Sequence, residues 1–153
     1  MALPLTERET NAMSDPLPPD LAAHYEDPYH CGPLDAPTHA AERAHDDCVD
    51  GRDLLLLELK IGGGVIEEAW FQGEGCPWSQ AAASLLAEVI EGSSADSDVS
   101  AIEQQMEAAA DEPPESRRGC FRLAAACLRD ALRSRLDDED GPTFSGPNLG
   151  EEQ

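Results

Sequence analysis

The chain has 153 residues, enough for one domain with a modest core, and a formal net charge of −22. That acidity argues against a nucleic-acid partner, because neutralising phosphates requires a basic surface. No apolar run is long enough to span a bilayer, and the N-terminus lacks the basic start and apolar stretch of a signal peptide. We therefore expect a cytoplasmic protein with no membrane partner, whose five cysteines are free thiols or metal ligands rather than disulfides.

Both ends of the chain differ in composition from its middle. Residues 1–19 contain four prolines among polar residues, and residues 137–153 are acidic, contain glycine and proline, and have no hydrophobic period. Such segments cannot bury enough apolar surface to fold. The sequence thus predicts a disordered N-terminal segment over 1–19, one domain over 20–136 and a disordered acidic tail over 137–153.

The first half of the domain predicts a short helix and a hairpin. Residues 21–26 are expected to be helical and 27–33 to be a loop, whereas 36–47 fit either a weak helix or a poor edge strand. The clearest strand covers 53–61, where alternate leucines face one way and Glu58 and Lys60 face the other. Three glycines at 62–64 then turn the chain into a second strand over 65–72.

The second half of the domain predicts three helices. Pro77 suits a first helical position, and apolar residues at helical spacing continue to Gly92, where a glycine can end the helix. A second helix is expected to start near Val99 and to stop before Pro113. A third should run from about residue 118 to residue 136.

Three cysteines stand at the ends of these predicted elements. Cys48 precedes the first strong strand, Cys76 lies in the turn that opens a helix, and Cys120 is in the first turn of the last helix. A helix N-terminus favours a thiolate over a thiol, and soft thiolates select zinc, Cu(I) or iron–sulfur species. The three thiolates could converge on one metal or cluster. Because no CxxC pair is present, five unrelated free thiols remain an alternative at this point.

Several short motifs follow one another over residues 21–136. They are H-Y-E-D-P from His24 with Gly32 after it, C-V-D from Cys48, the strand from Val65 that ends in G-C at Cys76, the helix from Ser79 to Gly92 with Ser84 and Glu88 in register, and P-P followed by Cys120. In this combination the chain resembles the iron–sulfur cluster assembly scaffold proteins of the IscU type, which also form the N-terminal domain of NifU.

The resemblance implies an α+β sandwich, in which a small, mostly antiparallel β-sheet packs with helices on one side. It also implies a site formed by Cys48, Asp50, Cys76 and Cys120. In such scaffolds the thiolates receive sulfur from a cysteine desulfurase, assemble a [2Fe–2S] cluster with iron and pass it to apo-proteins. The chain is therefore expected not to be an enzyme. The carboxylate keeps the cluster labile, since oxygen holds iron less softly than a thiolate does.

The chain also departs from the scaffold pattern. Val49 replaces a glycine, and Gly119 replaces the histidine before the last cysteine, as in the related SufU proteins. The chaperone-recruiting motif is reduced to residues 112–116, so the resemblance does not carry an Hsp70-type chaperone over to this chain. One alternative is a SufU-like, zinc-containing protein that accepts persulfide sulfur on Cys120 and relays it. Another is a relative that binds one zinc ion structurally.

Three further residues could be mistaken for ligands. His45 is the rival of Asp50 as fourth ligand, but is expected to be a solvated surface histidine, because residues 40–47 have no strong structure to hold an imidazole. Cys127 lies about 10 Å along the predicted helix from Cys120, too far to share one ion. Cys31 is expected to be a small packed side chain in a loop.

Overall fold

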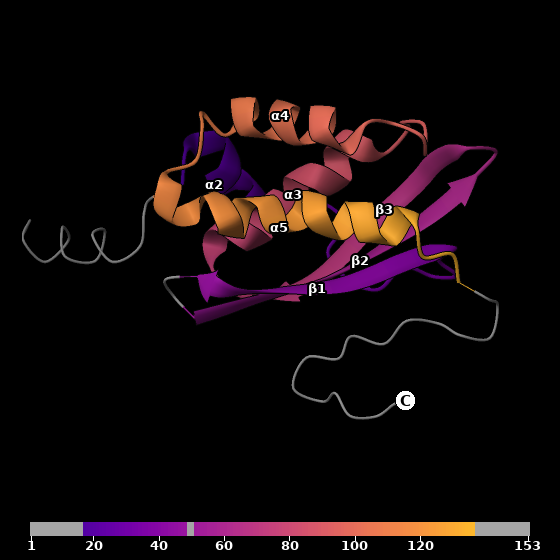
Figure 1. The fold of residues 1–153 in the computed structure, drawn as a ribbon, viewed down its shortest axis with the longest axis horizontal. Helices are drawn as coiled ribbons and strands as arrows, with labels where there is room; N and C mark the ends of the chain where they lie inside the picture. Colours follow the sequence, from indigo (N-terminus) through magenta and orange to yellow (C-terminus); the bar gives the residue numbers. More distant parts are fainter. Residues whose placement is uncertain (1–16, 49–50, 137–153) are drawn as a thin grey trace, which may run out of the picture.

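The computed structural model describes residues 17–48 and 51–136, which form a sheet covered by helices (Figure 1). The described strands and helices are α2 (Pro19–Glu26), β1 (His39–Cys48), β2 (Gly51–Gly62), β3 (Val65–Glu74), α3 (Pro77–Ile90), α4 (Val99–Ala109) and α5 (Glu115–Leu132). Helices α3 and α5 lie directly on one face of the sheet, and α4 lies outside them. The predicted α+β class is confirmed. The segments expected to be disordered, 1–19 and 137–153, lie outside the described residues apart from 17–19, and Pro19 begins α2.

The sheet is antiparallel, in the order β1-β2-β3. The β2–β3 hairpin closes over Gly63 and Gly64, whose φ angles are 60° and 79°. Two positive φ angles in a two-residue turn match the twist of the flanking strands, and glycine adopts them without a steric penalty. The predicted hairpin therefore forms where the glycines predict it.

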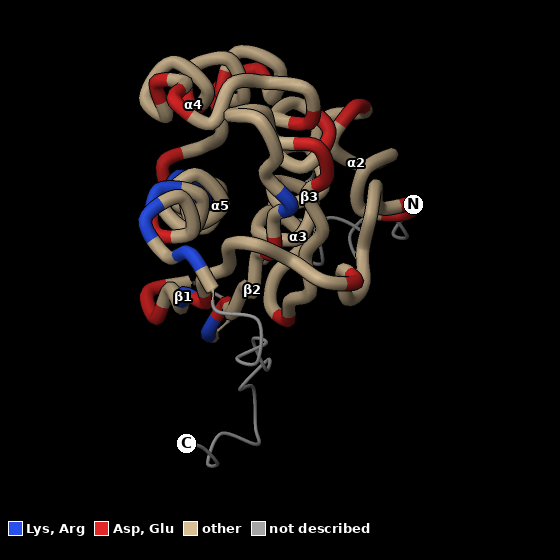
Figure 2. Tube along the Cα trace, turned by 90° about the vertical axis from the view of Figure 1, so that its right-hand side faces the viewer, with Lys and Arg blue, Asp and Glu red and all other residues tan. Residues whose placement is uncertain are grey.

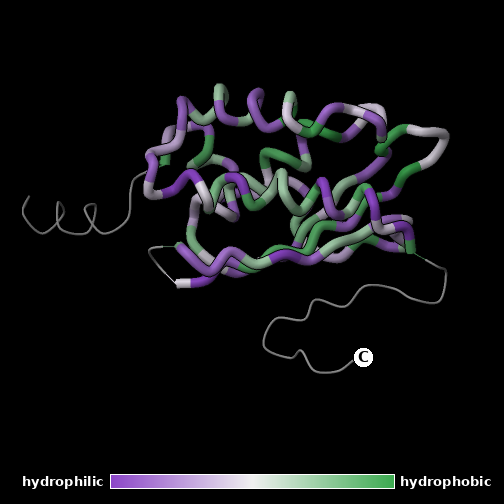
Figure 3. Tube along the Cα trace, viewed as in Figure 1, coloured by the Kyte–Doolittle hydropathy of each residue, from purple (hydrophilic) through white to green (hydrophobic). Residues whose placement is uncertain are grey.

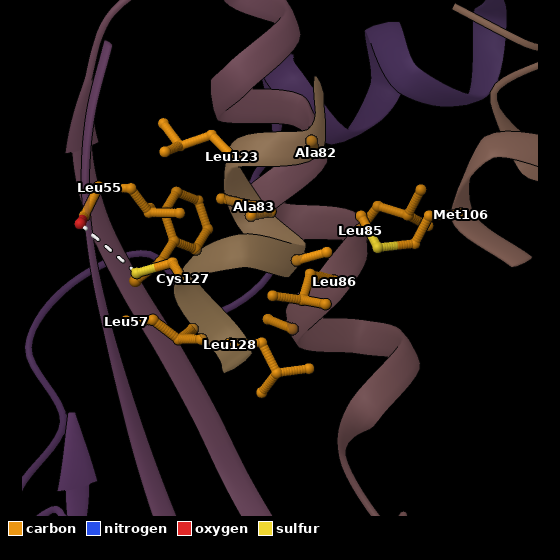
Figure 4. Close-up of a cluster of buried hydrophobic side chains, with 14 of the residues drawn as sticks. Leu55, Leu57, Ala82, Ala83, Leu85, Leu86, Met106, Leu123, Cys127 and Leu128 are labelled. Atoms are coloured by element: carbon orange, nitrogen blue, oxygen red, sulfur yellow. Dashed lines mark hydrogen bonds between the residues drawn. The ribbon is translucent and has the colours of Figure 1, made fainter. Parts of the chain in front are cut away.

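The core lies between the sheet and the two helices that cover it. Leu55, Leu57 and Leu59 are at most 1% exposed, and they face α3 and α5. Figure 4 shows Leu57 beside Leu128 of α5, with Leu85 and Leu86 of α3 on the other side of that helix. Figure 3 shows the hydrophobic stretches concentrated between the layers, as the alternation in the sequence predicts.

The opposite face of the sheet is also covered, which the sequence analysis did not foresee. Glu58, on the side opposite the core leucines, is only 4% exposed, and its Oε1 accepts a hydrogen bond of 2.9 Å from the backbone N–H of Leu34. Burial raises the pKa of Glu58, and the Leu34 N–H partly offsets that rise. The loop before β1 thus shields the central strand on this side, which explains why Leu56 is buried as well.

Both edges of the sheet are protected by neighbouring segments. At β1, Ala40 donates to the carbonyl of Ser134, and Leu136 donates to that of Thr38. At β3, Gly32 donates to the carbonyl of Phe71 at 2.8 Å. Paired edges cannot template aggregation. The ambiguous stretch 36–47 is thus a strand from residue 39, and α5 ends at residue 132, four residues earlier than predicted, because the chain after it pairs with β1.

Candidate metal centre

Three thiols and one carboxylate converge where β1, β2, α3 and α5 meet. The ligand atoms of Cys48, Asp53, Cys76 and Cys120 all lie within 4.8 Å of one another. Their residues are 7%, 0%, 3% and 0% exposed, respectively. Such a buried group of potential anions requires compensation by protons, by a cation or by a metal.

Cys76 is positioned by the tight turn between β3 and α3. Gly75 has φ of 140°, and a Cβ there would lie 2.3 Å from Oδ1 of Asp53, so only glycine fits. Cys76 is the residue before α3, and Pro77 opens the helix. The backbone N–H of Cys76 donates to Oδ1 of Asp53 at 2.8 Å, and its Sγ lies 3.9 Å from Oδ2. The carboxylate therefore links the start of β2 to the start of α3.

A buried cation borders the thiols. Arg117, in the first turn of α5, is 0% exposed and donates from Nη1 to Sγ of Cys48 at 3.6 Å. Figure 2 shows basic residues on and after α5. Arg122, Arg133 and Arg135 among them are exposed, whereas Arg117 is buried. A buried guanidinium stabilises thiolates because it lowers the cost of removing their charge from water.

The thiols of Cys76 and Cys120 are joined by a hydrogen bond; Cys120 lies in the second turn of α5, which begins at Glu115, and not in the first turn as expected. A hydrogen bond from the Cys120 thiol lowers the pKa of Cys76 to about 6; burial works against this effect, while the backbone N–H of Ser79 adds to it. The same bond raises the pKa of Cys120, and burial raises it further. Without metal, the site thus holds a Cys76 thiolate that accepts a hydrogen bond from the protonated Cys120 thiol.

The donor set fits a thiophilic metal. Tetrahedral zinc with Zn–S bonds near 2.3 Å requires sulfur atoms about 3.8 Å apart, and the four donors lie within 4.8 Å of one another. Three thiolates and one carboxylate oxygen also suit iron–sulfur species. The geometry alone accommodates either kind of metal.

Of the predicted ligands, Cys48, Cys76 and Cys120 are brought together, and their binding of a metal stays a prediction. Asp50 lies outside the described residues. The carboxylate that the structure places among the thiols is Asp53, which the sequence analysis treated only as the start of a strand. One signal could have identified it: Asp53 alternates with the leucines that face the core, where a charged residue requires a partner.

The other two cysteines lie outside this cluster. Sγ of Cys127 donates to the carbonyls of Ala41, at 3.2 Å, and Leu55, at 3.7 Å (Figure 4). Burial raises the pKa of Cys127 to about 12, so it is an inert core thiol. The expectation that Cys31 is packed is wrong, because it is exposed on the segment that forms a single bridge to the edge of β3.

Comparison with known proteins identifies close similarities. The family model for the NifU-like N terminal domain matches residues 19–137. The iron–sulfur cluster assembly scaffold protein IscU of Thermotoga maritima is 32% identical over 119 residues, 67% of this chain and 82% of that protein. The zinc-dependent sulfurtransferase SufU of Bacillus subtilis is 42% identical over 40 residues, 26% of this chain and 27% of its own.

A solved structure supports the same fold. The N-terminal NifU-like protein of Brucella abortus matches with a TM-score of 0.60 at 18% identity, over 81% of this chain and 94% of that one. In the described part of the chain, no helix is long and apolar enough to cross a membrane.

Proposed function

Because the chain belongs to the NifU-like N-terminal domain family, we propose that it is a scaffold on which an iron–sulfur cluster is assembled before transfer to apo-proteins. The observation that carries this proposal is the buried convergence of three thiols and one carboxylate. The similarity to the IscU of Thermotoga maritima, which is named a cluster assembly scaffold protein, supports the proposal. The match covers 82% of that protein. The cluster is cargo, so the protein has no turnover chemistry of its own.

The four side chains have distinct roles in this proposal. Cys48, Cys76 and Cys120 hold iron and sulfide as thiolates, and Asp53 is the weaker oxygen ligand that can be displaced on transfer. Asp53 takes the role that the sequence analysis assigned to Asp50. Its hydrogen bond to the Cys76 amide remains available when the carboxylate leaves the metal.

Arg117 completes the site as the buried counter-charge. Three thiolates and a carboxylate exceed the charge of one divalent metal, and an unbalanced buried anion is costly. The guanidinium beside Cys48 offsets part of this excess. The proposed partners are those that the resemblance to IscU-type scaffolds implies: a cysteine desulfurase that supplies sulfur, and recipient apo-proteins that accept the cluster.

A second candidate is zinc-dependent sulfur transfer, in which Cys120 accepts persulfide sulfur. Two observations favour it: the four donors suit tetrahedral zinc, and the Bacillus subtilis SufU shares a segment at 42% identity. In that case Cys48, Asp53, Cys76 and Cys120 would hold one resident zinc ion, and Cys120 would be the thiol that accepts the sulfur. Without metal, Cys120 is the protonated partner of the pair and thus the weaker nucleophile.

Anaerobic purification followed by metal analysis and absorption spectra separates the two candidates. The scaffold proposal expects iron and acid-labile sulfide, with charge-transfer bands in the visible range. The relay expects tightly bound zinc without sulfide, and a persulfide on Cys120 detectable by mass spectrometry after incubation with a desulfurase and cysteine. If neither the wild type nor the Cys127→Ala control binds iron or zinc, both candidate functions are contradicted.

A further inference from the structure

The imidazole of His45 lies against Gly119 in helix α5. A Cβ added to Gly119 would come within 2.6 Å of Cε1 and 2.9 Å of Nε2 of His45. The φ angle of Gly119 is not among the positive ones, so its backbone does not need glycine. Glycine inside a helix costs about 1 kcal/mol relative to alanine. The feature that requires glycine here is therefore the neighbouring imidazole.

Strand β1 holds that imidazole at the edge of the metal centre. His45 is the register partner of Asp53, and the two share the sheet face that α5 covers. Directly opposite residues in an antiparallel pair have Cβ atoms about 4.5–5.5 Å apart. His45 therefore borders Asp53 in the sheet and Gly119 in helix α5. Gly119 is the residue before Cys120. It is half-buried in a strand, so the expectation of a solvated surface histidine is wrong.

The chain between His45 and the first thiol is irregular. The β1–β2 register shifts between His45 and Cys48, which marks a bulge or similar irregularity. Bulges redirect side chains and are common beside functional sites. Here the irregularity lets residues 45 and 48, which regular alternation would send to opposite faces, both approach the centre.

In the proposed site, the Asp53 carboxylate could leave the metal and still keep a hydrogen-bond partner. Its Oδ1 accepts the Cys76 N–H at the start of α3, an interaction that a carboxylate keeps whether or not it binds metal. A neutral imidazole nitrogen is an established donor for zinc and iron. We propose that His45 is an alternate nitrogen ligand, which exchanges with Asp53 at the metal held by Cys48, Cys76 and Cys120.

This inference rests on the proposed metal-binding function. The direct test uses protein labelled with ¹⁵N-histidine and loaded with ¹¹³Cd, in which a cadmium–nitrogen coupling identifies a bound imidazole. The proposal expects the coupling in the wild type or, more strongly, in Asp53→Asn, which keeps the acceptor for the Cys76 amide but is a poor ligand. His45→Gln should abolish the coupling. Gly119→Ala should abolish it too, because the added Cβ displaces the ring.

Zinc affinity, measured by competition with a chelator, provides the second readout. In the Asp53→Asn background, His45→Gln should weaken binding at least as much as loss of an outer-shell partner does, about 10- to 100-fold. In the wild-type background the loss should be smaller, because Asp53 is still present. His39→Gln, in the same strand but opposite Leu59, is the matched control and should change neither value.

The outcomes are separable. Absence of the coupling from every protein that folds, or equal zinc affinity with and without His45 in the Asp53→Asn background, would overturn the inference while leaving the thiolate site intact. If Cys76→Ala and Cys120→Ala also left zinc affinity unchanged, the proposed function itself would fail.

Discussion

The backbone amide of Cys76 donates a hydrogen bond of 2.8 Å to Oδ1 of Asp53, which joins the start of β2 to the start of α3. Both residues are buried. An unpaired buried N–H costs about 1–3 kcal/mol, so Asp53→Ala should lower the free energy of unfolding of the metal-free protein by that amount. Asp53→Asn, which keeps an acceptor oxygen, should lower it by less. Urea denaturation measures the free energy of unfolding of both variants. Equal losses in the two would show that Asp53 does not stabilise the protein through this hydrogen bond.

The same carboxylate should set the lifetime of a bound cluster. If Asp53 is the displaceable ligand, its replacement by alanine should make a reconstituted cluster longer-lived and slow its transfer to an apo-ferredoxin. The decay of visible absorbance under chelator measures lifetime. Asp50→Ala is the matched comparison, since it removes the carboxylate that the sequence motif singled out. A longer lifetime in Asp50→Ala alone would return the role to Asp50.

The sequence predicted the elements whose hydrophobic period is strong. Strands β2 and β3 and helix α3 form within a few residues of the expected positions, because leucine alternation and the Pro77 start each favour one structure. Strand β1 stayed ambiguous since its residues include alanines and charges with little strand propensity. It forms because β2 and the chain after α5 pair with it on both sides.

The site was predicted less completely than the fold. The family resemblance singled out the three cysteines, whereas the carboxylate and the histidine depend on strand register. The register of β1 against β2 places His45 opposite Asp53, and a shift follows before Cys48. A linear motif that counts residues from Cys48 does not detect such a shift. The place of Arg117 in the site could not be predicted either, because its burial depends on how α5 packs against the thiols.

The metal-free site should titrate near neutral pH. The Cys120 hydrogen bond lowers the pKa of Cys76 from 9.0 to about 6. The folded state thus favours the thiolate; this contribution to stability is complete above about pH 9 and is lost as the pH falls through about 6. Ultraviolet thiolate absorbance should show one such titration, which Cys76→Ser removes and Cys120→Ala moves upward. An unchanged titration in Cys120→Ala would contradict the hydrogen bond between the two thiols.

Residues 1–16 and 137–153 should be dispensable for folding and metal binding. In the part of the chain that the structure describes, Leu17 packs against the buried core, and the N–H of Leu136 donates to the carbonyl of Thr38. A chain truncated to 17–136 should therefore keep its zinc affinity, and its thermal midpoint should stay within about 4 °C of that of the full chain. A larger fall, or loss of zinc, would show that the domain boundaries are wrong.

Reconstitution of cysteine variants tests the central claim most directly. Each protein is incubated anaerobically with ferrous iron, cysteine, a cysteine desulfurase and excess dithiothreitol, which reduces persulfide sulfur to sulfide; the iron and acid-labile sulfide bound per chain are then measured. We predict equal amounts of iron and sulfide in the wild type and in Cys127→Ala, and neither in Cys48→Ala, Cys76→Ala or Cys120→Ala. Retention of the full iron and sulfide content by any of these three variants, or its loss in Cys127→Ala alone, would contradict the account.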